Sequence, residues 1–124
     1  MRTSIFEING EKHLLCFNLW AIAECMERFG GLTEMHDAMT KGSVKENLDA
    51  SIWVMEILQR GGEMYAEEMG VKNAEPLSAK RMLSICGADF FASLKNIVIG
   101  AINSSMSTNV KVEDSKNVET TQAE

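Results

Sequence analysis

The sequence has little proline, no long apolar run and no signal peptide. It has a single proline, and 45% of its 124 residues are apolar, which is typical of one globular domain. No apolar run is long enough to cross a bilayer, and the first ten residues lack the apolar segment of a signal peptide. We therefore expect a single domain over residues 1–106, located in the cytoplasm and without contact with a membrane.

Basic clusters and paired cysteines are also missing. The net charge is −6 and lysine and arginine are scattered, so the positive surface that nucleic-acid binding needs is not expected. Cys16, Cys25 and Cys86 are odd in number, widely spaced and set in apolar sequence. This pattern favours reduced core thiols over disulfides or zinc ligands.

Catalytic and metal-binding motifs are not found either. His36-Asp37 is a His/carboxylate neighbour pair, but adjacent helical residues point in different directions, so a solvated histidine is the better interpretation. Glu63, Glu67 and Glu68 have no histidine or aspartate beside them and are typical of a solvated acidic face. No glycine-rich phosphate loop follows a strand. We expect no enzyme activity, no cofactor and no metal.

What the sequence does contain is a long helix at residues 44–69. Ser43 and Glu46 have the spacing of a capping box at its start. Gly61-Gly62 is expected to weaken this helix without ending it, because glycine costs about 1 kcal/mol in a helix interior. Its apolar residues recur at steps of three and four and form a stripe: Val44, Leu48, Ile52, Met55, Ile57 and Leu58.

Residues 3–17 are predicted to form a β-hairpin. Asn9-Gly10 is the dipeptide favoured in two-residue turns with positive φ. Such a turn pairs Glu7 with Lys12, whereas a bulge shifts the register, and the sequence leaves both open. Since a lone hairpin is only marginally stable, it must pack on helices or pair its edge with another subunit. Two inward-facing sets fit the second strand equally: Leu15 with Phe17, or Leu14 with Cys16.

Four further helices are expected at about residues 19–29, 34–40, 79–85 and 88–104. Asn18, Thr33 and Ser78 are suitable N-caps for the first three. The fold class is therefore α+β, with an N-terminal hairpin on a bundle of four to five helices. Residues 107–124 are polar and charged, which favours a disordered tail. The expected core residues are Ile22, Met26, Leu48, Ile52, Met55, Leu94 and Ile97.

The last helix is apolar nearly all round, which indicates burial on more than one side. One interpretation is that part of it forms a partner-binding surface, because large apolar patches usually mark interaction sites. The other interpretation is a fully internal core helix. The candidate partner-binding residues are Phe90, Phe91, Leu94, Val98 and Ile102.

The order of these segments resembles a family of tail assembly chaperones of Gram-positive siphophages and prophages, which is related to the gene-transfer-agent tail proteins. The resemblance extends over nearly the whole chain. The segments that carry it are residues 6–10 (FEING), the strand at 14–17, the helix at 21–30, the central helix at 48–58, Pro76-Leu77-Ser78 and Ser115-Lys116-Asn117.

The resemblance implies a role in tail morphogenesis inside the bacterial host cell. Such proteins bind the tape measure protein and help recruit tail tube subunits, made of the major tail protein, and they are usually absent from the finished particle. Alternatives are a structural minor tail or tail tube component retained in the virion, a small enzyme, or a helix-turn-helix regulator. The last conflicts with the acidic charge. Association of the chain with itself stays open.

Genes of this family often produce a second, longer product by ribosomal frameshifting. Lys116-Asn117 can be encoded by a run of adenines on which a ribosome slips. The alternative is that this pair is ordinary tail sequence. The codons of the gene distinguish the two.

Overall fold

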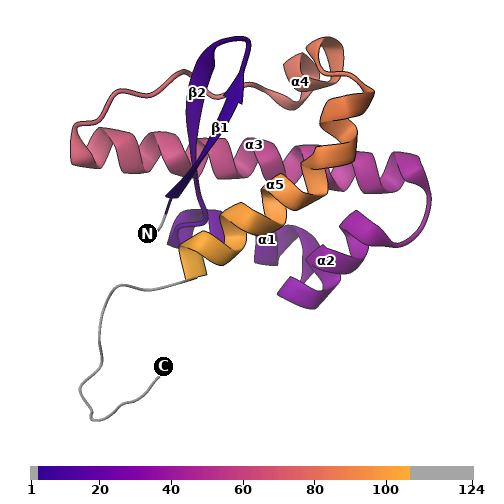
Figure 1. Cartoon of the computed structure of the whole chain (residues 1–124). Helices are drawn as coiled ribbons and strands as arrows, with labels where there is room; N and C mark the ends of the chain where they lie inside the picture. Colours follow the sequence, from indigo (N-terminus) through magenta and orange to yellow (C-terminus); the bar gives the residue numbers. More distant parts are fainter. Residues whose placement is uncertain (1–2, 107–124) are drawn as a thin grey trace, which may run out of the picture.

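The long helix α3 forms the axis of the molecule, and the other elements pack along it (Figure 1). The computed structural model describes residues 3–106, so the predicted tail at 107–124 lies outside the described residues. This arrangement confirms the predicted α+β fold, a hairpin packed on five helices. The elements are β1 (Thr3–Ile8), β2 (Glu11–Cys16), α1 (Leu19–Phe29), α2 (Leu32–Thr40), α3 (Val44–Met69), α4 (Ala79–Ile85) and α5 (Ala88–Met106).

The helix ends agree with the prediction for α1, α3 and α4 and differ for the other two. Helix α2 begins at Leu32 rather than at residue 34, and Thr33 is not its cap. The reason is that the carbonyl oxygen of Gly31 accepts a hydrogen bond from the N–H of Met35 at 3.0 Å, which extends the helix by two residues at its start. Helix α5 continues to Met106 rather than ending near residue 104.

Side chains cap three of the helices as the sequence predicts. The Asn18 Oδ1 accepts a hydrogen bond from the N–H of Ala21 at 2.9 Å, at the start of α1. At α3 the capping box is complete. The Ser43 N–H donates to the Glu46 carboxylate at 3.0 Å, and the Glu46 N–H donates to the Ser43 hydroxyl at 3.1 Å. At the start of α4 the Ser78 hydroxyl accepts a hydrogen bond from the N–H of Arg81 at 3.2 Å. Local sequence therefore determines where these helices start.

The hairpin has a two-residue turn. Asn9 and Gly10 have φ values of 52° and 80°, as a tight turn with two left-handed residues requires. The strands pair Glu7 with Lys12, which settles the register that the sequence left open. On β2, Leu15 is fully buried and Leu14 is only half-buried.

The hairpin lies on α3 at the glycine pair Gly61-Gly62. A Cβ atom at Gly62 would overlap the backbone carbonyl of Leu14, and one at Gly61 would overlap the carbonyl oxygen of Cys16. Helix α3 is continuous through both glycines, as predicted. The two glycines allow the β2 backbone to approach α3 closely, because only a residue without a side chain lets that backbone lie directly on the helix.

The core is one cluster in which the hairpin, α3 and α5 meet. Three of the residues predicted for it, Ile52, Met55 and Leu94, are buried. The other predicted members are half-buried and pack against the cluster: Ile22, Met26, Leu48 and Ile97. The prediction that α3 joins the first and last helices is therefore confirmed.

A buried glutamine fixes the segment that connects α3 to α4. Gln59 is 1% exposed, and its side-chain amide forms two hydrogen bonds with the backbone of Leu77. The Leu77 N–H donates to Oε1 at 2.8 Å, and Nε2 donates to the Leu77 carbonyl oxygen at 3.2 Å. The backbone N–H and C=O of Leu77 belong to no helix or strand, and the Gln59 amide supplies their hydrogen bonds. Because buried backbone groups need such partners, the connection can be buried at this residue.

Candidate partner-binding groove

The five α5 residues predicted to bind a partner divide into an outer and an inner set. Phe91 is 40% exposed, and Phe90 is half-buried. Leu94, Val98 and Ile102 lie in the core. In this arrangement a partner can reach Phe91 and part of Phe90, whereas the other three support the helix from inside. Partner binding itself stays a prediction.

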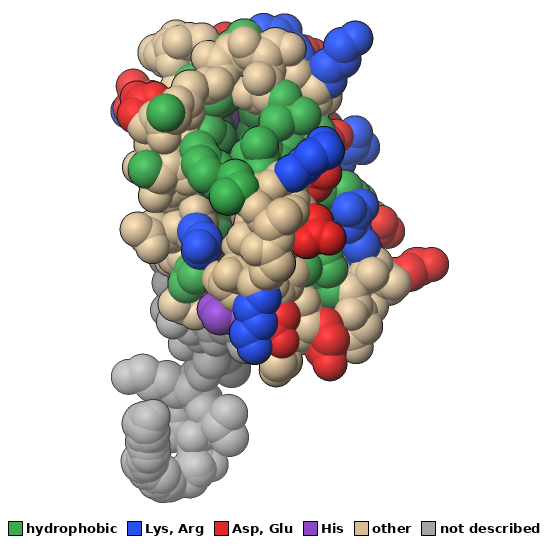
Figure 2. Space-filling view, turned by 90° about the vertical axis from the view of Figure 1, so that its right-hand side faces the viewer, with side chains coloured by type: hydrophobic (Ala, Val, Ile, Leu, Met, Phe, Trp, Pro, Cys, Tyr) green, Lys and Arg blue, Asp and Glu red, His purple; other side chains and the backbone are tan. Residues whose placement is uncertain are grey.

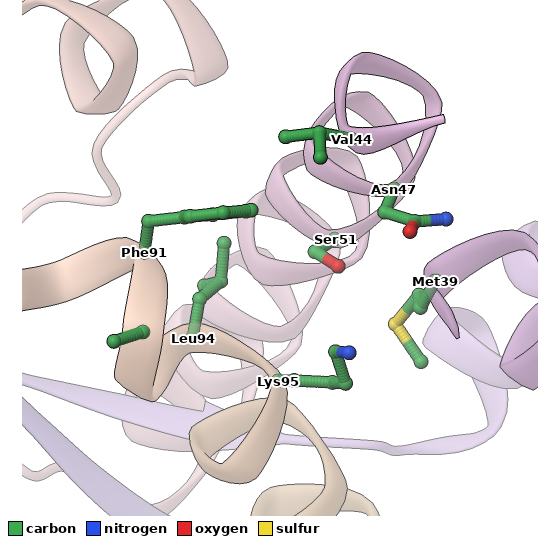
Figure 3. A pocket seen from close by; sticks show the side chains of 8 residues that line it. Met39, Val44, Asn47, Ser51, Phe91, Leu94 and Lys95 are labelled. Atoms are coloured by element: carbon green, nitrogen blue, oxygen red, sulfur yellow. The ribbon is translucent and has the colours of Figure 1, made fainter. Parts of the chain in front are cut away.

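A groove of about 270 Å³ lies where the start of α5 faces α3 and the end of α2 (Figure 3). We call it the α3–α5 groove. Phe91 and Leu94 point from α5 toward α3, and the Lys95 side chain extends across toward Met39 on α2. The lining residues are Met39, Val44, Asn47, Ser51, Phe91, Ala92, Leu94 and Lys95.

The contact between the end of α2 and the start of α3 shapes one side of this groove. The Asn47 side-chain amide donates hydrogen bonds to the carbonyl oxygens of Ala38 at 3.0 Å and Lys41 at 2.7 Å, which holds the end of α2 against α3. Met39 is thereby buried as the floor. Val44 is the first residue of α3, so no earlier turn covers it and its side chain is 68% exposed.

Apolar side chains also gather around the groove on the molecular surface. Figure 2 shows them around a hollow on the face that carries the start of α3 and the α4–α5 corner, with basic side chains beside them. Val44 and Phe91, which line the α3–α5 groove, are 68% and 40% exposed. Exposed apolar side chains that gather in one place are typical of an interaction site.

The chemistry of the α3–α5 groove suits binding. Lys95 is the one ionisable side chain among the residues that line it, and Asn47 and Ser51 are neutral. The residues that line the groove include no carboxylate and no imidazole. The groove therefore offers apolar contact and one positive charge.

The cysteines have the properties of core thiols. None of the three forms a disulfide within residues 3–106, and Cys16 and Cys25 are buried. Burial raises the pKa of the Cys25 thiol to about 11, and the charge of Glu24 adds to this shift. Burial, with a smaller effect of Asp89, also raises the pKa of Cys86. At neutral pH these two thiols are protonated, which is unfavourable for a nucleophile.

The remaining candidate groups are not assembled into a site. His36 is exposed, and its Nδ1 lies 4.0 Å from Asp37 Oδ1, too far for a hydrogen bond. Within residues 3–106, no three His, Cys, Asp or Glu side chains lie close enough together to hold a metal ion. None of the helices in the described part of the chain has the length and apolar character needed to span a membrane.

One buried ionisable group was not identified from the sequence. His13 is 1% exposed and packs 5.7 Å from the Phe6 ring, and neither of its ring nitrogens has a hydrogen-bond partner in the described part of the chain. Burial lowers the pKa of His13, and the Glu11 carboxylate and the Ala74 backbone oppose part of this shift. The sequence held one signal for this burial. His13 lies two residues before Leu15 on β2, and residues two apart on a strand share a face.

Comparisons with protein-family models, curated proteins and solved structures found no match.

Proposed function

We propose that this chain is a phage tail assembly chaperone. It binds the tape measure protein and helps recruit tail tube subunits of the major tail protein in the cytoplasm of the host cell. It acts by binding alone, without a cofactor. The order of sequence segments supports this assignment, and the open apolar α3–α5 groove is the structural observation that carries it.

The groove suggests how a partner would be held. An apolar side chain of the partner enters between the exposed side chains of Val44 and Phe91. Burying one such side chain contributes about 1.5–3 kcal/mol, so several neighbouring contacts would be needed for a stable complex. Lys95, at the exposed edge, pairs with an acidic residue of the partner, which affects association rate and specificity more than affinity.

Substitution of Phe91 tests this mode of binding. Phe91→Asp places a charge in the groove, and we expect it to weaken co-purification with a tape measure protein by about tenfold or more. Met69→Asp is the matched control, because Met69 is also exposed but lies at the far end of α3 and does not line the groove. Equal loss in both variants would argue against the groove. No binding of the unsubstituted protein to any tape measure fragment would refute the chaperone proposal.

The alternative, a tail component retained in the virion, has one observation in its favour. Strand β1 has a free edge that another subunit could extend. Mass spectrometry of purified particles separates the two functions. A chaperone is expected to be absent from finished particles, whereas a component is present in a fixed ratio to the major tail protein.

A further inference from the structure

Strand β1 has a row of unpaired backbone groups along its outer edge. The sheet has two strands, and Ile8 pairs with Glu11 beside the two-residue turn. In such a hairpin that first pair exchanges hydrogen bonds, so the N–H and C=O groups of Glu7 and Ile5 point away from β2. These groups form no hydrogen bond with the other described residues.

The opposite edge of the hairpin is closed. The same alternation turns the backbone groups of Lys12 and Leu14 outward on β2. The Lys12 carbonyl oxygen accepts a hydrogen bond from the Ala74 N–H at 3.4 Å, and the Leu14 N–H donates to Asn73 Oδ1 at 2.8 Å. The connection between α3 and α4 thus covers β2, and β1 alone is left open.

A groove of about 560 Å³ follows this open edge, between β1 and the corner where α4 meets α5. We call it the β1 groove. Its hairpin side consists of five consecutive residues, 5–8 of the strand and Asn9 of the turn. Successive side chains of a strand point to opposite faces, so a groove lined by all five runs along the edge and not over one face.

The lining of the β1 groove is apolar with two acidic groups. Ile5 and Ile85 are 62% and 44% exposed, and Phe90 forms part of the opposite wall. Glu7 and Asp89 are the charged residues among those that line it, and neither lysine nor arginine is found there. A ligand that fills this groove therefore binds more tightly if it carries apolar side chains and positive charge.

We propose that the β1 groove binds an extended segment of a protein partner in which apolar residues alternate with lysine or arginine. The segment adds to β1 as a third strand of the sheet. Outward backbone groups repeat at every second residue, about 6.6 Å apart, which an extended chain matches and a helix does not. Its basic side chains face Glu7 and Asp89. A second copy of β1 carries a glutamate and no basic residue, so it lacks this charge complementarity.

The test is an NMR titration of the isotopically labelled full chain. The probe is a heptapeptide of alternating valine and lysine, blocked at both ends. It is expected to shift the amide signals of Ile5 and Glu7 and to slow their hydrogen exchange. Two matched peptides, one with glutamate for lysine and one N-methylated at alternate residues, are expected to bind about tenfold more weakly, because each loses one class of contact.

Two variants connect the binding to β1. Ile5→Pro removes one outward N–H and leaves the hairpin ladder intact, since proline is tolerated on the open side of an edge strand. We expect it to weaken binding about tenfold, whereas Ile5→Val, which keeps the N–H, binds like the unsubstituted chain. If Ile5→Pro does not fold, Glu7→Gln gives the second readout. It should weaken binding of the lysine peptide and reduce its dependence on salt.

Three results would overturn the proposal. Equal binding of the N-methylated peptide would show that no third strand forms. Signal changes confined to residues outside the β1 groove would place the site elsewhere. Dimerisation that Ile5→Pro abolishes, measured by sedimentation without peptide, would assign the edge to a second copy of this chain. Because the probe is a synthetic peptide, these results are independent of whether the tape measure protein is a partner.

Discussion

Replacing Gly62 by alanine tests the role assigned to the glycine pair in α3. In an exposed helix position this change adds about 1 kcal/mol to the free energy of unfolding, because alanine has the higher helix propensity. At Gly62 the new methyl group would overlap the backbone carbonyl of Leu14. That atom belongs to a strand and cannot rotate away like the end of a side chain, so the hairpin has to shift.

The expected effect of Gly62→Ala is a net loss of stability. Overpacking of a well-packed interior costs about 1–3 kcal/mol, and displacing a strand belongs at the upper end of that range. After the gain in helix propensity, we expect the free energy of unfolding to fall by about 2 kcal/mol. Urea denaturation followed by far-UV circular dichroism measures this difference.

Gly100 provides the matched control in α5. It is exposed, and apart from its chain neighbours and the backbone of its own helix, no atom of the described residues lies within 4 Å of a Cβ atom built there. Gly100→Ala should therefore raise the free energy of unfolding by about 1 kcal/mol. If Gly62→Ala is as stable as Gly100→Ala, the hairpin does not rest on the glycine pair and the reasoning is wrong.

Two further substitutions test buried polar groups. Gln59→Leu removes both hydrogen bonds to the Leu77 backbone, and we expect it to lower the free energy of unfolding by about 3 kcal/mol and to increase proteolysis at 71–78. An unchanged urea midpoint would contradict this. The lowered pKa of His13 means that the unfolded chain binds the proton more readily, so stability should decrease as the pH falls through about 6.5. His13→Phe should lose less stability between about pH 7.5 and 5.5; equal losses would locate the effect in another group.

Much of the fold could be predicted from short stretches of sequence. The Ser43–Glu46 capping box, the Asn18 cap and the Asn9-Gly10 turn each depend on groups a few residues apart, and all three form as expected. Such signals act through local backbone hydrogen bonds and φ values, so they do not depend on the rest of the chain. The apolar stripe of α3 likewise determined which face is buried.

The candidate site was predicted less completely, because it depends on contacts between distant segments. The apolar sequence of α5 predicted burial on more than one side, yet only the packing of α3 and the hairpin decides that Leu94 is buried while Phe91 stays exposed. Val44 belongs to the same stripe as Ile52, but its place in the first turn of α3 leaves it at the rim of the α3–α5 groove.

The sequence by itself thus determined where the helices and the turn form, since these follow from neighbours in the chain. Tertiary structure alone decided that Gly61-Gly62 supports a strand, that Gln59 holds Leu77, and that His13 is buried without a hydrogen-bond partner among the described residues. It also decided that Asn73 and Ala74 cover the edge of β2 while that of β1 is left open. The physical reason is that each of these depends on the approach of groups far apart in the sequence, which no local propensity encodes.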